Sequence, residues 1–365
     1  MRITLLLACV VFSGSDSGAR ADDLDACQVR VVLFIPSDVA PPAKYQQRID
    51  DIVDYAEAFF RREFERWGHK NTVMPFRRSR DGHVEVALIR GKQPTARYKP
   101  VTVRMEVMDL NRAQNKLPQG RQIWWILVYA GAPPAEFDGY LGGFGEQIGG
   151  WAVCNFNTAP GRIDPDSPLG SDFLEDLTLK GMIHELGHGL QLPHIGPLLR
   201  DNAGNTLMGP THAHFRRNGG RDDRVYLSEA EAALLTNHPA FRGGADRPKP
   251  LPRVDVHGME YTADVKAKML VVRGRLVASQ RANYAVVGDE SDARPGEYWT
   301  KTYVGKVESD GQFRVVVTEP SESKGTLKTW FAFDGGAQTG DGKNRGRGSG
   351  ISKAYTYGRG EWKFQ

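Results

Sequence analysis

The sequence predicts an α+β protein built from two domains, a mixed N-terminal domain and an all-β C-terminal sandwich. A strand, a long helix and further strands follow one another between residues 28 and 129, which is typical of a mixed α/β domain. Beyond residue 254 the pattern changes to short strands at regular spacing, which is typical of a β-sandwich. Residues 243–253, rich in glycine and proline, are the predicted linker. We therefore expect domains at 22–242 and 254–365.

Each element at the start of the first domain is predicted from its own pattern. Residues 28–36 are β-branched and end in a proline, which predicts a short buried strand. Residues 45–67 carry apolar side chains at helical spacing and are followed by Gly68, which predicts a long helix that ends there. Further strands are predicted at 83–90, 101–107 and 122–129.

The middle of the chain combines a glycine-rich segment with two predicted helices. Residues 139–156 are rich in glycine and aromatic residues, which predicts a loop followed by an exposed or edge strand. Ser171 or Asp172 can cap a helix that continues to residue 190 on apolar spacing. Ser228 can cap a second helix, over 228–235, which has acidic residues in its first turn.

The second domain is predicted to contain only strands and turns. A basic, glycine-rich stretch at 340–350 is interpreted as a mobile loop and not as a ligand site. The predicted strands are 267–277, 284–287, 298–304, 313–318 and 327–333.

Residues 1–21 predict a secretory signal peptide. Arg2 provides a positive start, residues 3–12 form an apolar run, and residues 19–21 are an A-x-A-like cleavage site. The apolar run is too short to span a bilayer, and no later stretch approaches the required length. We therefore expect a secreted or extracytoplasmic protein without a transmembrane segment. A lipid anchor on Cys9 is the alternative, although apolar residues continue past that cysteine.

Two cysteines, Cys27 and Cys154, remain after the predicted signal peptide. In an oxidising compartment they predict one disulfide across a long loop, with a contribution to stability of about 4–5 kcal/mol. The alternative is that Cys27 ligates a metal as a latency thiol, but no motif surrounds it. The near balance of 48 basic and 44 acidic residues gives no argument for a nucleic-acid partner.

The segment His184-Glu185-Leu186-Gly187-His188 carries the chemistry. On a helix, residues four apart lie on the same face, so two imidazoles there can bind one Zn²⁺ at about 2.0–2.1 Å. Glu185 lies next to the first histidine and can reach a zinc-bound water without being a ligand. The metal lowers the pKa of that water towards about 7, and the carboxylate takes its proton as a general base.

His194 is the predicted third ligand, because a catalytic zinc needs three protein ligands and an open fourth position. Pro193 disfavours helical conformation at Leu192, so the chain is expected to turn there and to bring His194 back towards the metal.

These residues resemble the metzincin metallopeptidases, whose pattern is H-E-x-x-H-x-x-G-x-x-H followed by a Met-turn. The segment 205–210 resembles that turn, and the resemblance implies that Met208 forms an apolar floor beneath the zinc. It also implies a catalytic domain with a twisted mixed sheet and long helices. It further implies an upstream edge strand that pairs with the substrate, for which 149–154 is the candidate, with Trp151 near the cleft or in the core.

The chain departs from the family pattern at two positions. Gln191 stands where the family has a glycine in left-handed conformation, which costs about 1 kcal/mol or more. Pro210 stands two residues after Met208, where some branches have a tyrosine ligand. The first departure leaves Asp201, His212 and His214 open as third ligands. Two competing interpretations are Cys154 as a ligand, as in peptide deformylases, and Glu229 or Glu231, as in thermolysin-like enzymes, but Cys154 lacks the deformylase cysteine motif and both glutamates suit an ordinary helix start.

The sequence therefore predicts a secreted zinc endopeptidase that acts on a protein or peptide. One alternative is an inactive metal-binding homologue whose C-terminal domain binds a glycan or a protein, although Glu185 argues against it. The other is a different zinc hydrolase, such as a deformylase or an exopeptidase.

Overall fold

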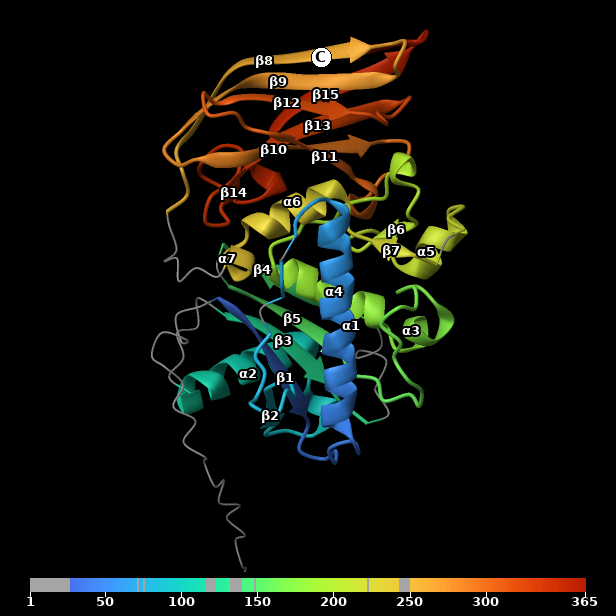
Figure 1. Ribbon diagram of the computed structural model, residues 1–365, viewed down its shortest axis with the longest axis vertical. Coiled ribbons are helices and arrows are strands. Elements are labelled where there is room, and N and C mark those ends of the chain that lie inside the picture. Colours follow the sequence, from blue (N-terminus) through green and yellow to red (C-terminus); the bar gives the residue numbers. More distant parts are fainter. Residues whose placement is uncertain are drawn as a thin grey trace, which may run out of the picture.

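The computed structural model describes residues 27–365 apart from 71, 75, 116–121, 132–139, 148, 222 and 243–249. The predicted signal peptide, Cys9 and most of the predicted linker lie outside the described residues. Within the described residues, no helix combines the length and the apolar character needed to cross a membrane. The architecture is the α+β class expected, with a twisted mixed sheet and helices followed by a β-sandwich (Figure 1).

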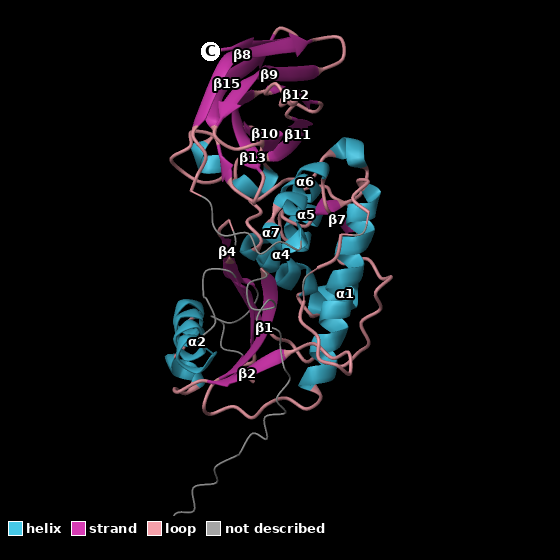
Figure 2. Cartoon of the chain, turned by 60° about the vertical axis from the view of Figure 1, so that its left-hand side comes forward, coloured by secondary structure: helices cyan, strands magenta, loops and turns pink. Residues whose placement is uncertain are grey.

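A five-stranded sheet in the order β2-β1-β3-β5-β4 is the centre of the N-terminal domain. The first four of these strands run parallel and β4, at the edge, is antiparallel. Helices cover both faces, which explains why most residues of the inner strands are apolar (Figure 2). The strand bounds are β1 Gln28–Ile35, β2 Val86–Arg90, β3 Gln122–Val128, β4 Tyr140–Gly145 and β5 Gly150–Asn155.

Two helices lie on opposite faces of this sheet (Figure 2). Helix α1, Tyr45–Arg66, buries its apolar side against one face, as the sequence predicted. Helix α2, Pro100–Asn115, packs on the other face through Val103 and Val107. The predicted strand at 101–107 is therefore wrong. Its alternating valines resemble a strand, but the buried pair is spaced four apart and Pro100 suits the first turn of a helix.

The predicted helix over 171–190 is split in two. Helix α3 is Asp172–Asp176 and α4 is Leu179–Gly189, and Thr178 between them has a left-handed φ of 56°. After α4 come β6 Asn205–Thr206, α5 His212–Arg217, β7 Val225–Tyr226, α6 Glu229–Asn237 and α7 Pro239–Arg242. The predicted cap of α6 is confirmed, because Ser228 and Glu231 form a reciprocal capping box.

Glycines allow α4 to lie directly on strands β4 and β5. A β carbon at Gly143, Gly145 or Gly150 would collide with the backbone of residues 185–191. This close approach is the physical reason for glycine at these three positions of β4 and β5. Helix α4 is thereby held against the edge of the sheet.

The C-terminal domain is a β-sandwich of a three-stranded sheet, β12-β9-β8, and a larger sheet, β11-β10-β13-β15-β16, with β14 beside β13. The five predicted strands are present with shifted ends, whereas β8, β14, β15 and β16 were not predicted. Hydrogen bonds between Gly340 N and Ser349 Oγ (2.7 Å) and between Thr339 Oγ1 and Asn344 O (2.6 Å) fix the 340–350 segment, contrary to the expected mobile loop. The bounds are β8 Val254–Asp264, β9 Met269–Ala278, β10 Ala282–Ser291, β11 Lys301–Lys306, β12 Gln312–Val317, β13 Lys324–Phe333, β14 Gln338–Thr339, β15 Ile351–Gly358 and β16 Glu361–Phe364.

The two domains share an apolar core. Helix α6 lies between the rest of the N-terminal domain and the sandwich, in contact with β10, β11 and β13 (Figure 1). Val286, Trp330 and Ala332 of the sandwich belong to the same buried cluster as Ala232 and Leu235 of α6. Apolar burial therefore holds the two domains in their relative position.

The predicted disulfide is wrong, since Cys27 and Cys154 are both buried and are not joined. Cys154 lies opposite Leu127 of β3, which in turn lies opposite Leu33 of β1. The cysteines are thus two strands apart, about 10 Å, and Cys27 lies six residues before Leu33, about 20 Å along the strand. A disulfide requires a Cα separation below about 7 Å.

We expect a reductant to leave the melting temperature of the protein unchanged, because the cysteines contribute no crosslink. The measurement is thermal unfolding of the chain from residue 22 with and without dithiothreitol. A lower melting temperature under reducing conditions would indicate that the disulfide forms after all.

Helix α4 ends in a Schellman motif that directs the chain towards His194. Leu192 N–H donates to Gly187 O (2.9 Å) and Gln191 N–H donates to His188 O (2.9 Å). Gln191 occupies the position that favours glycine, with a φ of 68°. The turn of the family pattern is therefore made despite the glutamine, at the cost of a strained backbone.

Replacing this residue, Gln191→Gly, is expected to raise the free energy of unfolding by about 0.5–1 kcal/mol, because glycine adopts positive φ without a β-carbon clash. Urea unfolding of the two proteins measures the difference. A loss of stability would show that packing of the Gln191 side chain outweighs the relief of strain.

Candidate metal centre

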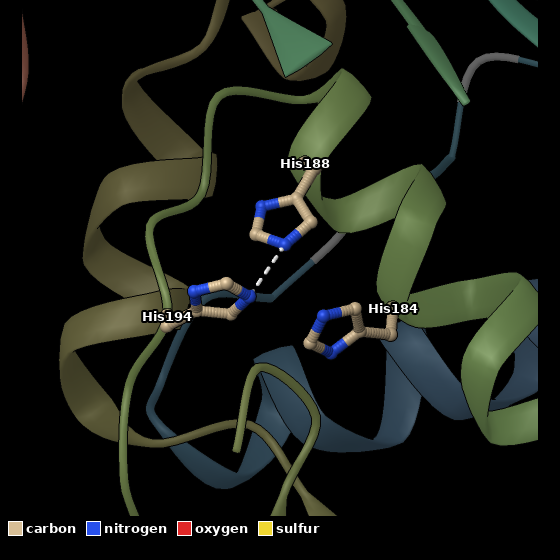
Figure 3. A group of neighbouring side chains, drawn as sticks. All are labelled: His184, His188 and His194. Carbon is tan, nitrogen blue, oxygen red and sulfur yellow. Dashed lines mark hydrogen bonds between the residues drawn. The ribbon is translucent and has the colours of Figure 1, made fainter. Parts of the chain in front are cut away.

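Three imidazoles converge at the C-terminal half of α4. His184 and His188 project from the helix and His194 projects from the segment that follows it (Figure 3). One nitrogen from each ring lies within 4.8 Å of the others, and the Nε2 atoms of His188 and His194 are 3.0 Å apart. Across the described ranges, this is the one group of three or more such side chains close enough to hold a metal ion.

The second ring nitrogen of each histidine faces a hydrogen-bond acceptor. Nδ1 of His184 lies 2.8 Å from Leu207 O, and Nδ1 of His188 lies 2.8 Å from Leu192 O. Nδ1 of His194 lies 3.0 Å from Oε1 of Glu297. These contacts favour the tautomer with the proton on Nδ1, which turns the Nε2 lone pairs towards the shared centre.

Burial keeps the three rings neutral. Desolvation lowers the pKa of His188 to about 4, and it lowers the pKa values of His184 and His194 as well. Two neutral Nε2 lone pairs facing each other at 3.0 Å cannot hydrogen-bond to one another, whereas a cation between the rings satisfies both. Neutral imidazole nitrogens in a set of three therefore fit a metal ion such as Zn²⁺.

Glu185 has the environment of a proton acceptor. Its side chain is buried, and Oε2 has no hydrogen-bond partner among the described residues. Desolvation raises the pKa of this carboxyl to about 7. Burial of a carboxylate oxygen without a hydrogen-bond partner costs folding free energy, and such groups are often found at functional sites. Glu185 is also the carboxylate closest in sequence to the three histidines.

Met208 is fully buried against α4. A β carbon on Gly187 would lie 2.5 Å from Met208 Sδ, so the thioether packs on the helix at Gly187, beside the histidines. The turn around Met208 is fixed by Glu231, whose Oε1 accepts from Met208 N–H at 2.8 Å. The preceding carbonyl, Leu207 O, is the acceptor for His184.

The alternative third ligands have other partners and lie outside the triad. Asp201 pairs with Arg200 at 3.3 Å, His212 lies 3.5 Å from Asp223, and the ring of His214 meets Trp299 edge-on. Glu229 pairs with Arg200, Glu231 is the capping residue, and Cys154 Sγ lies 3.7 Å from Met182 O.

The predicted edge strand is wrong, because β5 pairs with β3 on one side and with β4 on the other. The edge is β4, and its Phe144 is 52% exposed. Trp151 lies on the face of the sheet away from the triad, where the guanidinium of Arg104 stacks on it at 4.5 Å. Successive residues of a strand point to opposite faces, and Gly150 faces α4, so Trp151 faces α2.

Sequence reasoning missed the C-terminal domain's part in the site. Glu297 and Tyr298, in the turn Glu297–Trp299 before β11, lie against His194, with the rings of Tyr298 and His194 3.8 Å apart. Arg347 Nη1 donates to His194 O at 3.2 Å. No local pattern marks these residues, because about a hundred residues or more of chain separate them from His194.

No family model and no curated protein matches the sequence. Solved structures of OgpA from Akkermansia muciniphila do match. For one crystal form of the wild type the TM-score is 0.72 at 19% identity, over 93% of this chain and 95% of that chain. Catalytically inactive OgpA in complex with an O-glycopeptide (glycodrosocin) substrate matches with a TM-score of 0.70 at 18% identity, over 93% and 95%. The likeness shows that this chain has the same fold over both domains.

Proposed function

We propose that this protein is a secreted zinc-dependent endopeptidase in which His184, His188 and His194 hold Zn²⁺ and Glu185 is the general base. The observation that carries the proposal is the convergence of three neutral imidazoles, each with its Nδ1 held by a separate acceptor. Three nitrogen ligands with an open fourth position are typical of catalytic zinc sites. Secretion is inferred from the signal-like sequence of residues 1–21.

The residues of the chain divide the work as follows. Zn²⁺, when bound, supplies a Lewis acid that polarises a carbonyl and acidifies water. Glu185 takes a proton from the attacking water and passes it to the nitrogen of the leaving amine. The buried Oε2 of Glu185 suits this task, since no described residue competes for it. Leu207 O, Leu192 O and Glu297 hold the imidazoles in orientation.

The substrate we propose is a protein or peptide in extended conformation. The outer edge of β4 can pair with such a chain through backbone hydrogen bonds. Gly143 of β4 lies against the backbone of Glu185, so a peptide on this edge would lie beside the triad. The O-glycopeptide bound to OgpA supports a glycosylated peptide as one substrate of this fold.

A first test removes the base. In Glu185→Gln we expect zinc content equal to that of the wild type and kcat lower by about 10²–10⁴-fold, because the amide cannot accept the proton. Elemental analysis and digestion of casein, a peptide library and an O-glycopeptide provide the measurements. Equal cleavage by both proteins would refute the mechanism. A zinc-loaded wild type that cleaves none of these substrates would favour the alternative, an inactive homologue whose C-terminal domain binds a glycan or protein.

A second test removes the third ligand. His194→Ala is expected to lose most of its zinc, because two imidazoles alone bind the ion weakly. His214→Ala and Asp201→Asn are the controls and should keep wild-type metal content. Full zinc in His194→Ala together with loss in a control would identify a different third ligand.

A further inference from the structure

We propose that the C-terminal domain completes the metal centre, with Glu297 as a positioning residue for His194. This inference rests on the proposed function, since it requires a metal at the triad. The β-sandwich then contributes a positioning residue to the metal site and is more than a separate binding module.

The geometry around His194 carries the proposal. Its Nε2 faces Nε2 of His188 at 3.0 Å, and its Nδ1 lies 3.0 Å from Oε1 of Glu297 on the opposite side of the ring. The corresponding acceptors of the other two histidines are backbone carbonyls of the N-terminal domain. His194 is thus the member of the triad whose acceptor is a carboxylate, and this carboxylate comes from the C-terminal domain.

Further contacts fasten the same segment to the sandwich. Arg347, with a side chain only 14% exposed, donates to His194 O at 3.2 Å and lies 3.5 Å from Oε2 of Glu297. The ring of Tyr298 packs on the His194 ring with the centroids 3.8 Å apart. Two residues further on, Gly196 N–H donates to Thr300 O at 2.8 Å. The side chain of His194 and the backbone of residues 194–196 therefore contact the same part of the C-terminal domain.

A carboxylate on Nδ1–H has two effects on a histidine ligand. It holds the proton on Nδ1 and the ring in one orientation, and it makes Nε2 more basic. The Glu297 side chain is 57% exposed, so water screens its charge and orientation is the larger effect. Loss of such an outer partner typically weakens metal binding by about 10–100-fold.

The experiment measures zinc affinity in the full-length mature chain by competition with a chromophoric chelator. We expect Glu297→Ala to bind zinc about 10–100-fold more weakly than the wild type. Glu297→Gln is expected to lose less, because its amide oxygen still accepts from Nδ1–H. The matched control is Glu290→Gln, since Glu290 lies 3.5 Å from the same Arg347 and pairs with Lys328. This control is expected to keep wild-type affinity.

Absorption of Co²⁺ in the site provides a second readout, because it reports ligand geometry and not fold. Its spectrum should change in Glu297→Ala and stay unchanged in Glu290→Gln, while metal-free thermal unfolding of both variants matches the wild type. Wild-type zinc affinity in both Glu297 variants would overturn the inference and leave the proposed function standing. An equal loss in the Glu290 variant would also overturn it, since the effect would then pass through Arg347. A wild type that binds no zinc would overturn the proposed function itself.

Discussion

The three histidine rings converge because the Nδ1 atom of each ring lies against a hydrogen-bond acceptor on the side away from the shared centre. Helix geometry brings His184 and His188 to one face, but the ring orientations depend on acceptors at Leu207, Leu192 and Glu297. Those acceptors come from the Met208 turn, from the segment after α4 and from the C-terminal domain. Three parts of the chain therefore meet at the site, and each part orients one of the three imidazole rings.

Close backbone packing makes this convergence possible. Gly143, Gly145 and Gly150 remove the side chains that would hold α4 away from the sheet edge, and Gly187 makes room for Met208 Sδ. The helix is thus fixed between β4 and β5 on one side and the Met208 turn on the other. Close packing of this kind transmits small displacements, so the face of α4 that carries His184 and His188 has little freedom to move away from the edge strand.

The interface between the domains combines apolar burial with polar contacts at the site. Trp330 and Ala332 join the core around α6, which positions the sandwich. Glu297 and Arg347 then reach His194 from that position. The apolar contacts supply the free energy of association, and the polar ones set the orientation of a single side chain.

Local features of the sequence determined much of the structure. The strand over 28–36, the helix over 45–67, the cap at Ser228 and the pair of histidines four residues apart each depend on neighbours within a few positions, so they could be predicted. Tertiary structure decided the rest. The valines at 101–107 form a helix because a sheet face is available to Val103 and Val107, and Cys27 and Cys154 stay apart because β3 lies between their strands. The edge strand and the contact between Glu297 and His194 depend on pairings between distant segments, which no local periodicity encodes.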